Sequence, residues 1–141
     1  MYTGFESATY TSFSSVPWNT YKTDITSVIV ENMISPVSTA YWFYGLNNCS
    51  YLDVENLNTS MTLDMSYTFY KTGYDVSSFN IIGLDSWNVS SVTKMSYMFD
   101  SAGYSATYTL DLSGWNVSSV TSYSNFNAGV ESKVIAPTWV N

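Results

Sequence analysis

Residues 110–126 read LDLSGWNVSSVTSYSNF, and versions of this stretch recur along most of the chain. Its apolar frame is Leu110, Leu112 and Trp115, followed by Asn116 and a pair of serines. The other copies of the frame are Val28, Val30 and Met33; Leu52, Val54 and Leu57; Ile82, Leu84 and Trp87; and Val134, Ala136 and Trp139. The first frame residues are at 28, 52, 82, 110 and 134, so the spacings are 24, 30, 28 and 24.

A repeat of this length with this frame is typical of a leucine-rich-repeat-like solenoid, in which no repeat buries its own apolar face without a neighbour. We therefore predict an α/β repeat fold in which residues 25–141 form a solenoid of about five rungs with a short parallel β-ladder. In residues 25–32, ITSVIVEN, apolar and polar side chains alternate as in a half-buried strand. Residues 1–24 should form an N-terminal cap that buries Trp18 and shields the first rung from water.

Stacked rungs should bring corresponding residues into columns about 4.8 Å apart. The first predicted column contains Leu52, Ile82 and Leu110, and the second contains Leu57, Trp87 and Trp115. A third column on the opposite side contains Phe43, Phe69, Phe99 and Phe126. These columns are the predicted core.

A return segment follows each frame, and its apolar residues are three and four positions apart. They are Leu63, Met65 and Phe69; Val92, Met95, Met98 and Phe99; and Val120, Tyr123 and Phe126. This spacing places the side chains on one face of a short helix or helical turn, with Ser91 and Ser119 as N-caps. A glycine follows the closing phenylalanine each time, as at Gly73 and Gly103, where a turn needs a positive φ. The sequence thus predicts short helical return segments.

The composition excludes several functions. Eleven acidic residues stand against four lysines, with no arginine or histidine and a net charge of −7, so the chain should be repelled by nucleic-acid phosphates. Without histidine, and with Cys49 as the single cysteine, structural zinc and Ser-His-Asp catalysis are excluded in their usual forms. We expect no enzyme activity, no cofactor and no bound metal. No apolar run approaches the roughly 20 residues of a membrane helix, so we expect no membrane insertion, and MYTGFESATY does not read as a secretory signal.

Several stretches of the sequence resemble those of a known protein family. WNVSSVTKMSYMF, residues 87–99, and LDLSGWNVSSVTSYSNF are similar to the repeat of BspA-like leucine-rich-repeat surface proteins, and residues 17–46 are similar to the segment that precedes such repeats. The resemblance implies an extracellular, non-enzymatic role in adhesion or protein recognition. The chain departs from the family where glycine replaces the cysteine that commonly follows the phenylalanine, and where Asn125 and Phe126 replace the Met-Phe pair.

Outward-facing strand positions should stack across the rungs. One column would contain Ile29, Asp53, Gly83, Asp111 and Ile135, and its neighbour Glu31, Glu55, Asp85, Ser113 and Pro137. The carboxylates of this acidic strand face are Glu31, Asp53, Glu55, Asp85 and Asp111. Like charges on adjacent strands repel, so the face is solvated, or it meets a basic partner, or it binds Ca²⁺.

Two polar patterns recur with the repeat. Tyr41, Tyr67 and Tyr97 each lie two residues before the closing phenylalanine, and they form either an exposed aromatic stripe for protein or glycan contacts or a half-buried packing layer. Asn58, Asn88 and Asn116 follow the third frame residue, each two positions before a serine. Each is formally a glycosylation sequon, but recurrence at one frame position favours a structural ladder, in which the amides satisfy backbone groups where the strand ends.

The last frame, with Val134 and Trp139, ends the sequence, and a terminal rung without a polar cap exposes apolar surface and unpaired strand groups. We therefore expect an assembly edge there that is covered by a second copy, by another protein, or by the remainder of a longer native protein.

Two functions fit these observations. The first is a non-enzymatic recognition or adhesion module on an outer surface, which binds a protein partner. The alternative is a structural or decoration subunit of a phage virion or filament, whose role is assembly.

Overall fold

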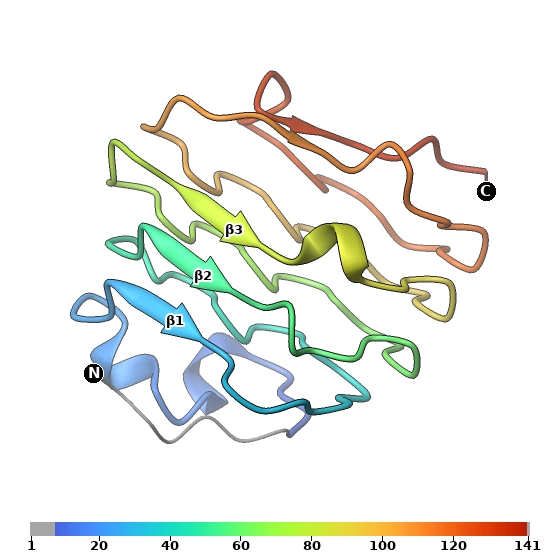
Figure 1. The fold of residues 1–141 in the computed structure, drawn as a ribbon, viewed down its shortest axis with the longest axis horizontal. Coiled ribbons are helices and arrows are strands. Elements are labelled where there is room, and N and C mark those ends of the chain that lie inside the picture. The colour runs from blue at the N-terminus through green and yellow to red at the C-terminus, as the bar shows by residue number, and fades with distance from the viewer. Residues whose placement is uncertain (1–7, 141) are drawn as a thin grey trace.

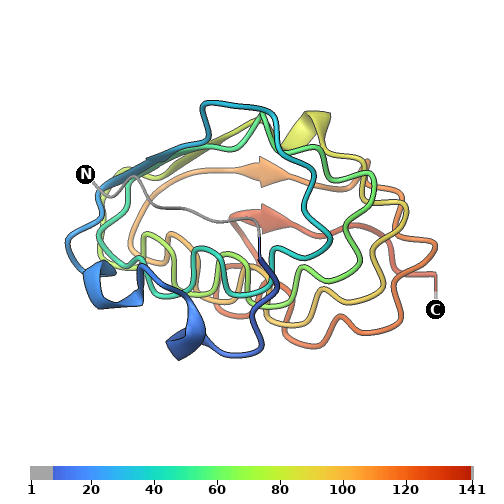
Figure 2. The ribbon, with the colours of Figure 1, turned by 90° about the horizontal axis from the view of Figure 1, so that it is seen from below.

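The computed structural model describes residues 8–140. Within them, the regular elements are η1 (Phe13–Ser15), η2 (Asn19–Tyr21), β1 (Ser27–Ile29), β2 (Tyr51–Asp53), β3 (Asn80–Ile82), η3 (Leu84–Ser86), β4 (Leu110–Asp111) and β5 (Val134–Ile135), where η denotes a 3₁₀ helix. The chain advances from one end of the molecule to the other as stacked coils (Figure 1). Each coil has a strand side and an opposite side made of turns (Figure 2).

The strands are short and all their pairings are parallel, as the frame predicts. Val28 pairs with Leu52 in the β1–β2 ladder, and Leu110 pairs with Val134 in the β4–β5 ladder. Because side chains alternate along a strand, Val28, Leu52 and Val134 turn inward and are buried. The ladder is not continuous, since β1, β2 and β3 form one sheet and β4 and β5 form another.

The register of the third strand differs from the predicted column by one residue. Leu52 pairs with Ile81, so Ile82 lies beside Asp53. The extra residue is accommodated at Gly83, which has φ of 105° and directly precedes η3. A Cβ atom there would lie 2.5 Å from the backbone of Glu55. A glycine bulge thus shifts the strand while Leu84 and Trp87 remain buried in the frame.

The prediction of helical return segments is wrong, because between residues 8 and 140 these segments are successive β-turns and contain no helix. Thr68 N–H donates to the Met65 carbonyl (3.3 Å) and Thr72 N–H to the Phe69 carbonyl (3.0 Å). The third residues of these two turns, Tyr67 and Lys71, have φ of 59° and 53°, as type II turns require.

The backbone donors between these turns bond to the next coil instead of to their own. Tyr67 N–H donates to the Ser96 carbonyl (3.1 Å) and Phe69 N–H to the Met98 carbonyl (2.8 Å). The turn side is therefore a second hydrogen-bonded ladder, with isolated parallel bridges from Ser38 to Asp64, from Asp64 to Lys94 and from Lys94 to Ser122. Turns of this kind also direct residues three and four apart inward, so the apolar spacing resembles that of a helix.

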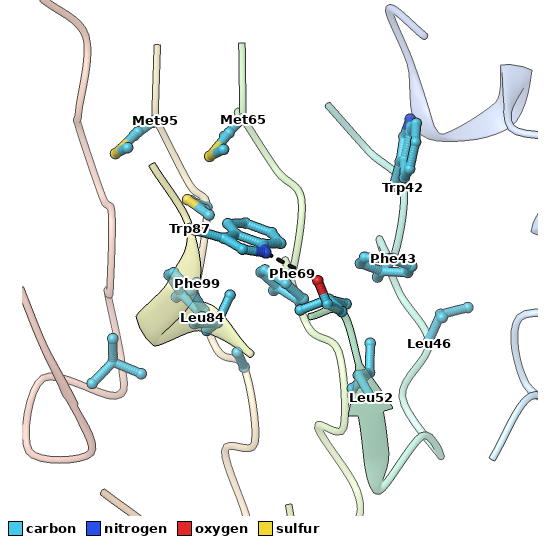
Figure 3. Close-up of a cluster of buried hydrophobic side chains, with 14 of the residues drawn as sticks. Trp42, Phe43, Leu46, Leu52, Met65, Phe69, Leu84, Trp87, Met95 and Phe99 are labelled. Atoms are coloured by element: carbon cyan, nitrogen blue, oxygen red, sulfur yellow. Dashed lines mark hydrogen bonds between the residues drawn. The ribbon is translucent and has the colours of Figure 1, made fainter. Parts of the chain in front are cut away.

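Aromatic side chains fill the space between the two sides. Phe43, Phe69 and Phe99 form the predicted column, with ring centroids 5.4 and 5.0 Å apart (Figure 3). Phe126 continues the column with its ring turned edge-on to Phe99, at an interplanar angle of 67°. Trp87 lies above this row, and its indole N–H donates to the Val54 carbonyl at 3.1 Å.

Buried threonines link neighbouring coils on the turn side. The Thr39 and Thr68 hydroxyls are 2.9 Å apart, and Thr68 also donates to the Met65 carbonyl at 2.8 Å. Thr72 donates to the Phe43 carbonyl at 2.6 Å. All three side chains are inaccessible to solvent. These bonds satisfy hydroxyl groups that would otherwise destabilise the core.

The described part of the predicted cap packs against the first coil. Trp18 is 1% exposed, and its indole N–H donates to the Trp42 carbonyl at 2.6 Å. The Trp42 indole in turn donates to the Ala8 carbonyl at 3.1 Å. Residues 1–7 of the predicted cap lie outside the described residues. Between residues 8 and 140, no helix has the length and apolar character that crossing a bilayer requires.

Candidate functional site

The acidic residues of the strand side do not form one continuous column. Ile29 and Ile82 flank Asp53 in the ladder, so the predicted neighbour Gly83 is displaced by one position. Asp111 lies beside Ile135. Glu31, Glu55, Asp85 and Asp111 are exposed and Asp53 is half-buried. Among the described residues, no group of three or more carboxylate or cysteine side chains is close enough to hold a metal ion.

Two of these carboxylates also have local structural roles. Asp53 accepts a hydrogen bond from the Glu55 backbone N–H at 3.2 Å, and Asp111 accepts one from the Ser113 N–H at 3.0 Å. Such turns fix the chain where it leaves the strand. Hydrogen bonds from Ser113, first from its side chain and then from its backbone, lower the pKa of Asp111. The Asp111 carboxylate is thus held charged at the surface.

A groove of about 520 Å³ opens on this acidic side, between the third and fourth coils. Residues of β3 and β4 form its walls, and its lining includes Trp87 and Trp115. Asp85, Asp111 and Asn88 also line it, and no lysine does. A volume of this size falls in the range of small-ligand sites, about 300–1,000 Å³. The groove coincides with the break between the two sheets and is not visible in the repeat pattern.

The two tryptophans of the groove are anchored to the coils below them. The Trp115 indole N–H donates to the Leu84 carbonyl at 3.2 Å, as Trp87 does to Val54. Their rings stack on one another, with centroids 6.3 Å apart and an interplanar angle of 12°. Trp87 is buried and Trp115 is half-buried. Their rings therefore pack mainly in the core, and their indole N–H groups are already bonded to main-chain carbonyls.

The predicted tyrosine stripe forms a stack on the turn side. The Tyr41 and Tyr67 centroids are 4.8 Å apart and those of Tyr67 and Tyr97 are 4.7 Å apart, with interplanar angles of 7° and 5°. All three residues have positive φ and are half-buried. Partial burial raises the pKa of Tyr41 and of Tyr67, with smaller contributions from Asp64 and from neighbouring tyrosines respectively. Because the ring faces cover one another, the stack presents ring edges and hydroxyl groups to solvent.

The recurring asparagines form turns within their own coils. Asn58 and Asn88 accept hydrogen bonds from the backbone N–H groups of Ser60 and Ser90, at 3.1 and 3.0 Å. Asn116 accepts the equivalent bond from Ser118 at 3.1 Å. The amides thus satisfy backbone groups, as predicted, but they do so within single coils and form local turns in place of the predicted ladder.

The residues of the predicted assembly edge are partly covered from within. Val134 is inaccessible to solvent. Trp139 stacks on Tyr123 with centroids 4.2 Å apart and meets Phe126 edge-on at 5.1 Å. Within the described chain, β5 pairs only with β4, and Ile135 on it is 42% exposed. The open part of this end is therefore the strand edge rather than the side chains of the frame.

Cys49 is buried, and its thiol donates to the Tyr51 carbonyl at 3.4 Å. Burial raises the pKa of the Cys49 thiol to about 12. The thiol is therefore protonated near neutral pH and packs as a small apolar group.

Comparison with known proteins gives a match to one family description. Residues 37–132, which include the second, third and fourth repeats and most of the turn side, match the family described as Mycoplasma protein of unknown function, DUF285. Neither a comparison with curated proteins nor one with solved structures gave a significant match.

Proposed function

The chain belongs to the family described as Mycoplasma protein of unknown function, DUF285, and from this premise we propose that it is a non-enzymatic recognition module displayed on an outer surface. The DUF285 family is associated with BspA-like repeat proteins. The stacked coils fit a leucine-rich-repeat-like solenoid of that kind, because a repeated frame supplies one strand and one core layer per coil. Surface display and adhesion are the roles that the resemblance implies.

The observation that carries this proposal is the groove between the third and fourth coils. It is the point where a regular scaffold opens, and Asp85 and Asp111 line it without a lysine beside them. Hydrogen bonds and stacked phenylalanines run along the rest of the molecule, so the groove lies on a framework that does not need to rearrange on binding. Preorganisation of this sort increases affinity for a given contact area. The acidic face selects partners with basic surfaces.

Binding to an array of immobilised extracellular proteins of graded isoelectric point tests this function. We expect the labelled chain to bind basic members, with affinity that falls between 50 and 500 mM salt because exposed charges are screened over about 10 Å at 0.1 M. The triple variant Asp53→Asn, Asp85→Asn, Asp111→Asn should lose this binding. A control variant with the same change of charge away from the face, Asp24→Asn, Asp75→Asn, Glu131→Gln, should retain it. Failure to bind any member, or equal binding by both variants, would contradict the proposal.

The alternative role, assembly in a virion or filament, draws on the outer edge of β5. Within the described residues β5 has a partner strand on one side only, and an edge of this kind with an exposed Ile135 can pair with a neighbouring copy or another chain. Light scattering over a hundredfold concentration range tests it, with Ile135→Lys as the edge variant and Ile29→Lys as an exposed-strand control. A capsid or tail gene beside this gene would favour assembly. A wild type that remains monomeric throughout would argue against it.

A further inference from the structure

We propose that the groove between β3 and β4 binds an extended polypeptide segment with basic side chains, which pairs through its backbone with the facing strand edges. This inference rests on the recognition function above and names the class of partner and its mode of binding. Addition of an extended peptide to a strand edge is a general recognition mode, in which main-chain hydrogen bonds supply affinity and side chains supply specificity.

The register shows which backbone groups face the groove. Asn80 N–H donates to the Ser50 carbonyl, and the Ile82 carbonyl accepts from Val54 N–H, so these residues of β3 turn toward β2. The groups of Ile81 between them therefore turn toward β4, because backbone direction alternates along a parallel strand. No strand of the described chain pairs with β3 on that side.

The same alternation applies to β4 on the other wall. Leu110 N–H donates to the Lys133 carbonyl (2.7 Å) and Leu112 N–H to the Ile135 carbonyl (2.9 Å), so both residues turn toward β5. The backbone groups of Asp111 then face β3 across the groove. Two strand edges of matching direction thus lie on either side of a space that no part of the described chain pairs with.

The third and fourth coils separate only on the strand side. On the turn side, Met95 N–H donates to the Ser122 carbonyl (2.7 Å), Tyr97 N–H to the Ser124 carbonyl (2.9 Å) and Phe99 N–H to the Phe126 carbonyl (2.7 Å). The two coils are therefore joined by backbone hydrogen bonds along the turn side, whereas on the strand side the Trp115 indole N–H joins them through the Leu84 carbonyl. A backbone inserted beside Ile81 and Asp111 meets their outward-facing donors and acceptors without breaking the backbone hydrogen bonds of the turn side.

The charge of the groove selects basic side chains. Asp85 and Asp111 are exposed at the opening, and the lining contains no cationic residue. The floor is apolar and includes Leu84 and Leu112. Side chains of an extended segment alternate in direction, so one set can contact the floor while the other reaches the carboxylates.

The tryptophans make an oligosaccharide a poorer occupant. Sugar rings pack against exposed aromatic faces, but Trp87 and Trp115 stack on one another and both indole N–H groups bond to main-chain carbonyls. The groove thus offers backbone groups and carboxylates more than aromatic faces, which favours a polypeptide.

Fluorescence anisotropy with defined peptides tests the inference on the full chain. The probe is a fluorescein-labelled heptapeptide of alternating lysine and valine. Its controls are the same peptide with glutamate for lysine, and the same peptide N-methylated at every valine, which keeps the charge but removes backbone donors. We expect the lysine peptide to bind, the glutamate peptide not to bind, and N-methylation to weaken binding by about tenfold or more. If the N-methylated peptide binds equally well, the peptide is held by charge attraction alone. That result would overturn the proposed backbone pairing with the strand edges.

Variants locate the binding. Gly114 lines the groove, and a Cβ atom added there meets no atom within 4 Å, so Gly114→Phe should occupy the groove without disturbing the fold. We expect it to abolish peptide binding, whereas Ser77→Phe, at an exposed residue that does not line the groove, should not. Asp85→Asn with Asp111→Asn should weaken binding more than Glu31→Gln with Glu55→Gln. Circular dichroism confirms that each variant is folded.

The outcomes separate this inference from the proposed function. Binding of proteins in the array without binding of the lysine peptide would overturn the inference and leave the recognition function standing. Loss of peptide binding in Gly114→Phe but not in Ser77→Phe supports both the inference and the recognition function. Unchanged peptide binding by Gly114→Phe, or stronger binding of a chitin hexasaccharide than of the peptide, would overturn the inference.

Discussion

The indole N–H of Trp87 donates a hydrogen bond of 3.1 Å to the main-chain carbonyl of Val54, in the preceding coil. The side chain thereby joins two coils and fills the core between the strand side and the turn side. Trp115 makes the equivalent bond to Leu84 one coil later. Each of these tryptophans thus fixes the position of its own coil on the one before it.

Trp87→Ala should therefore destabilise the protein by about 3–5 kcal/mol, the range for truncating a buried aromatic side chain. Trp87→Phe keeps an aromatic ring but loses the donor, so its cost should be smaller. Urea denaturation followed by circular dichroism measures both. A loss of less than about 1 kcal/mol for the alanine variant would contradict the packing described for this ring.

Gly83 tests the shifted register of β3. Its φ of 105° and the 2.5 Å approach of a hypothetical Cβ atom to the Glu55 backbone predict that Gly83→Ala is destabilising by about 1–3 kcal/mol or more. Gly114→Ala is the matched control, since its Cβ atom meets open space. Thermal melts of the two variants should separate clearly. Equal melting temperatures would mean that the bulge at Gly83 is absent.

Thr68 tests the hydrogen bonds between coils on the turn side. Thr68→Val keeps the shape of the side chain but removes its bonds to Thr39 and to the Met65 carbonyl, so we expect a loss of about 1–3 kcal/mol. Thr121→Val, at an exposed residue, should change stability by less than about 0.5 kcal/mol. Denaturant midpoints measured at one pH compare the two. A Thr68 variant as stable as wild type would show that the hydroxyl is dispensable.

Cys49 should make stability depend on pH above about 9. Burial raises the pKa of the folded thiol from 9.0 to about 12, so between these values the unfolded chain loses a proton that the folded chain keeps. The contribution of the buried thiol to the free energy of unfolding is therefore fully present below pH 9, and it is lost as pH rises toward 12. The free energy of unfolding is measured against pH for wild type and for Cys49→Ala. The difference between the two curves removes the contribution of the tyrosines. A difference that stays flat from pH 8 to 11 would contradict the burial of the thiol.

The frame allowed much of the strand side to be predicted. It placed Val28 opposite Leu52 and Leu110 opposite Val134, because apolar alternation and repeat spacing determine which residues stack. It failed at Ile82, where a glycine with positive φ inserts one extra residue. A single sequence shows that Gly83 is present but not that its φ is positive.

The helical interpretation of the return segments failed for a different reason. In successive turns, Met65, Phe69 and their equivalents point inward at the same three- and four-residue spacing as in a helix. The turns are selected by positive φ at Tyr67 and Lys71, residue types that carry no strong turn signal. Thr68 was not predicted as a core residue, because a threonine is expected at the surface unless its hydroxyl has a hydrogen-bond partner. That partner, Thr39 in the neighbouring coil, is known only from the structure.

The acidic carboxylates could be found from the sequence, but the groove beside them could not. Asp111 follows from alternation on the strand side, whereas Asp85 lies in η3, beyond the end of β3. The groove depends on the separation of β3 from β4, which results from how two coils stack and not from any motif within either. The tyrosine stripe was found as a pattern, and its stacking geometry required the structure.

The separation of β3 from β4 is the central claim, and amide hydrogen exchange measured by NMR tests it most directly. Ile81 and Asp111 should exchange their backbone protons quickly, because these groups face the groove, while their neighbours Ile82 and Leu110 should be protected by bonds to β2 and β5. Adding the lysine–valine peptide should slow exchange at Ile81 and Asp111 and leave Leu110 unchanged. Strong protection of Ile81 and Asp111 in the free protein would show a continuous ladder across the two coils and would contradict the account.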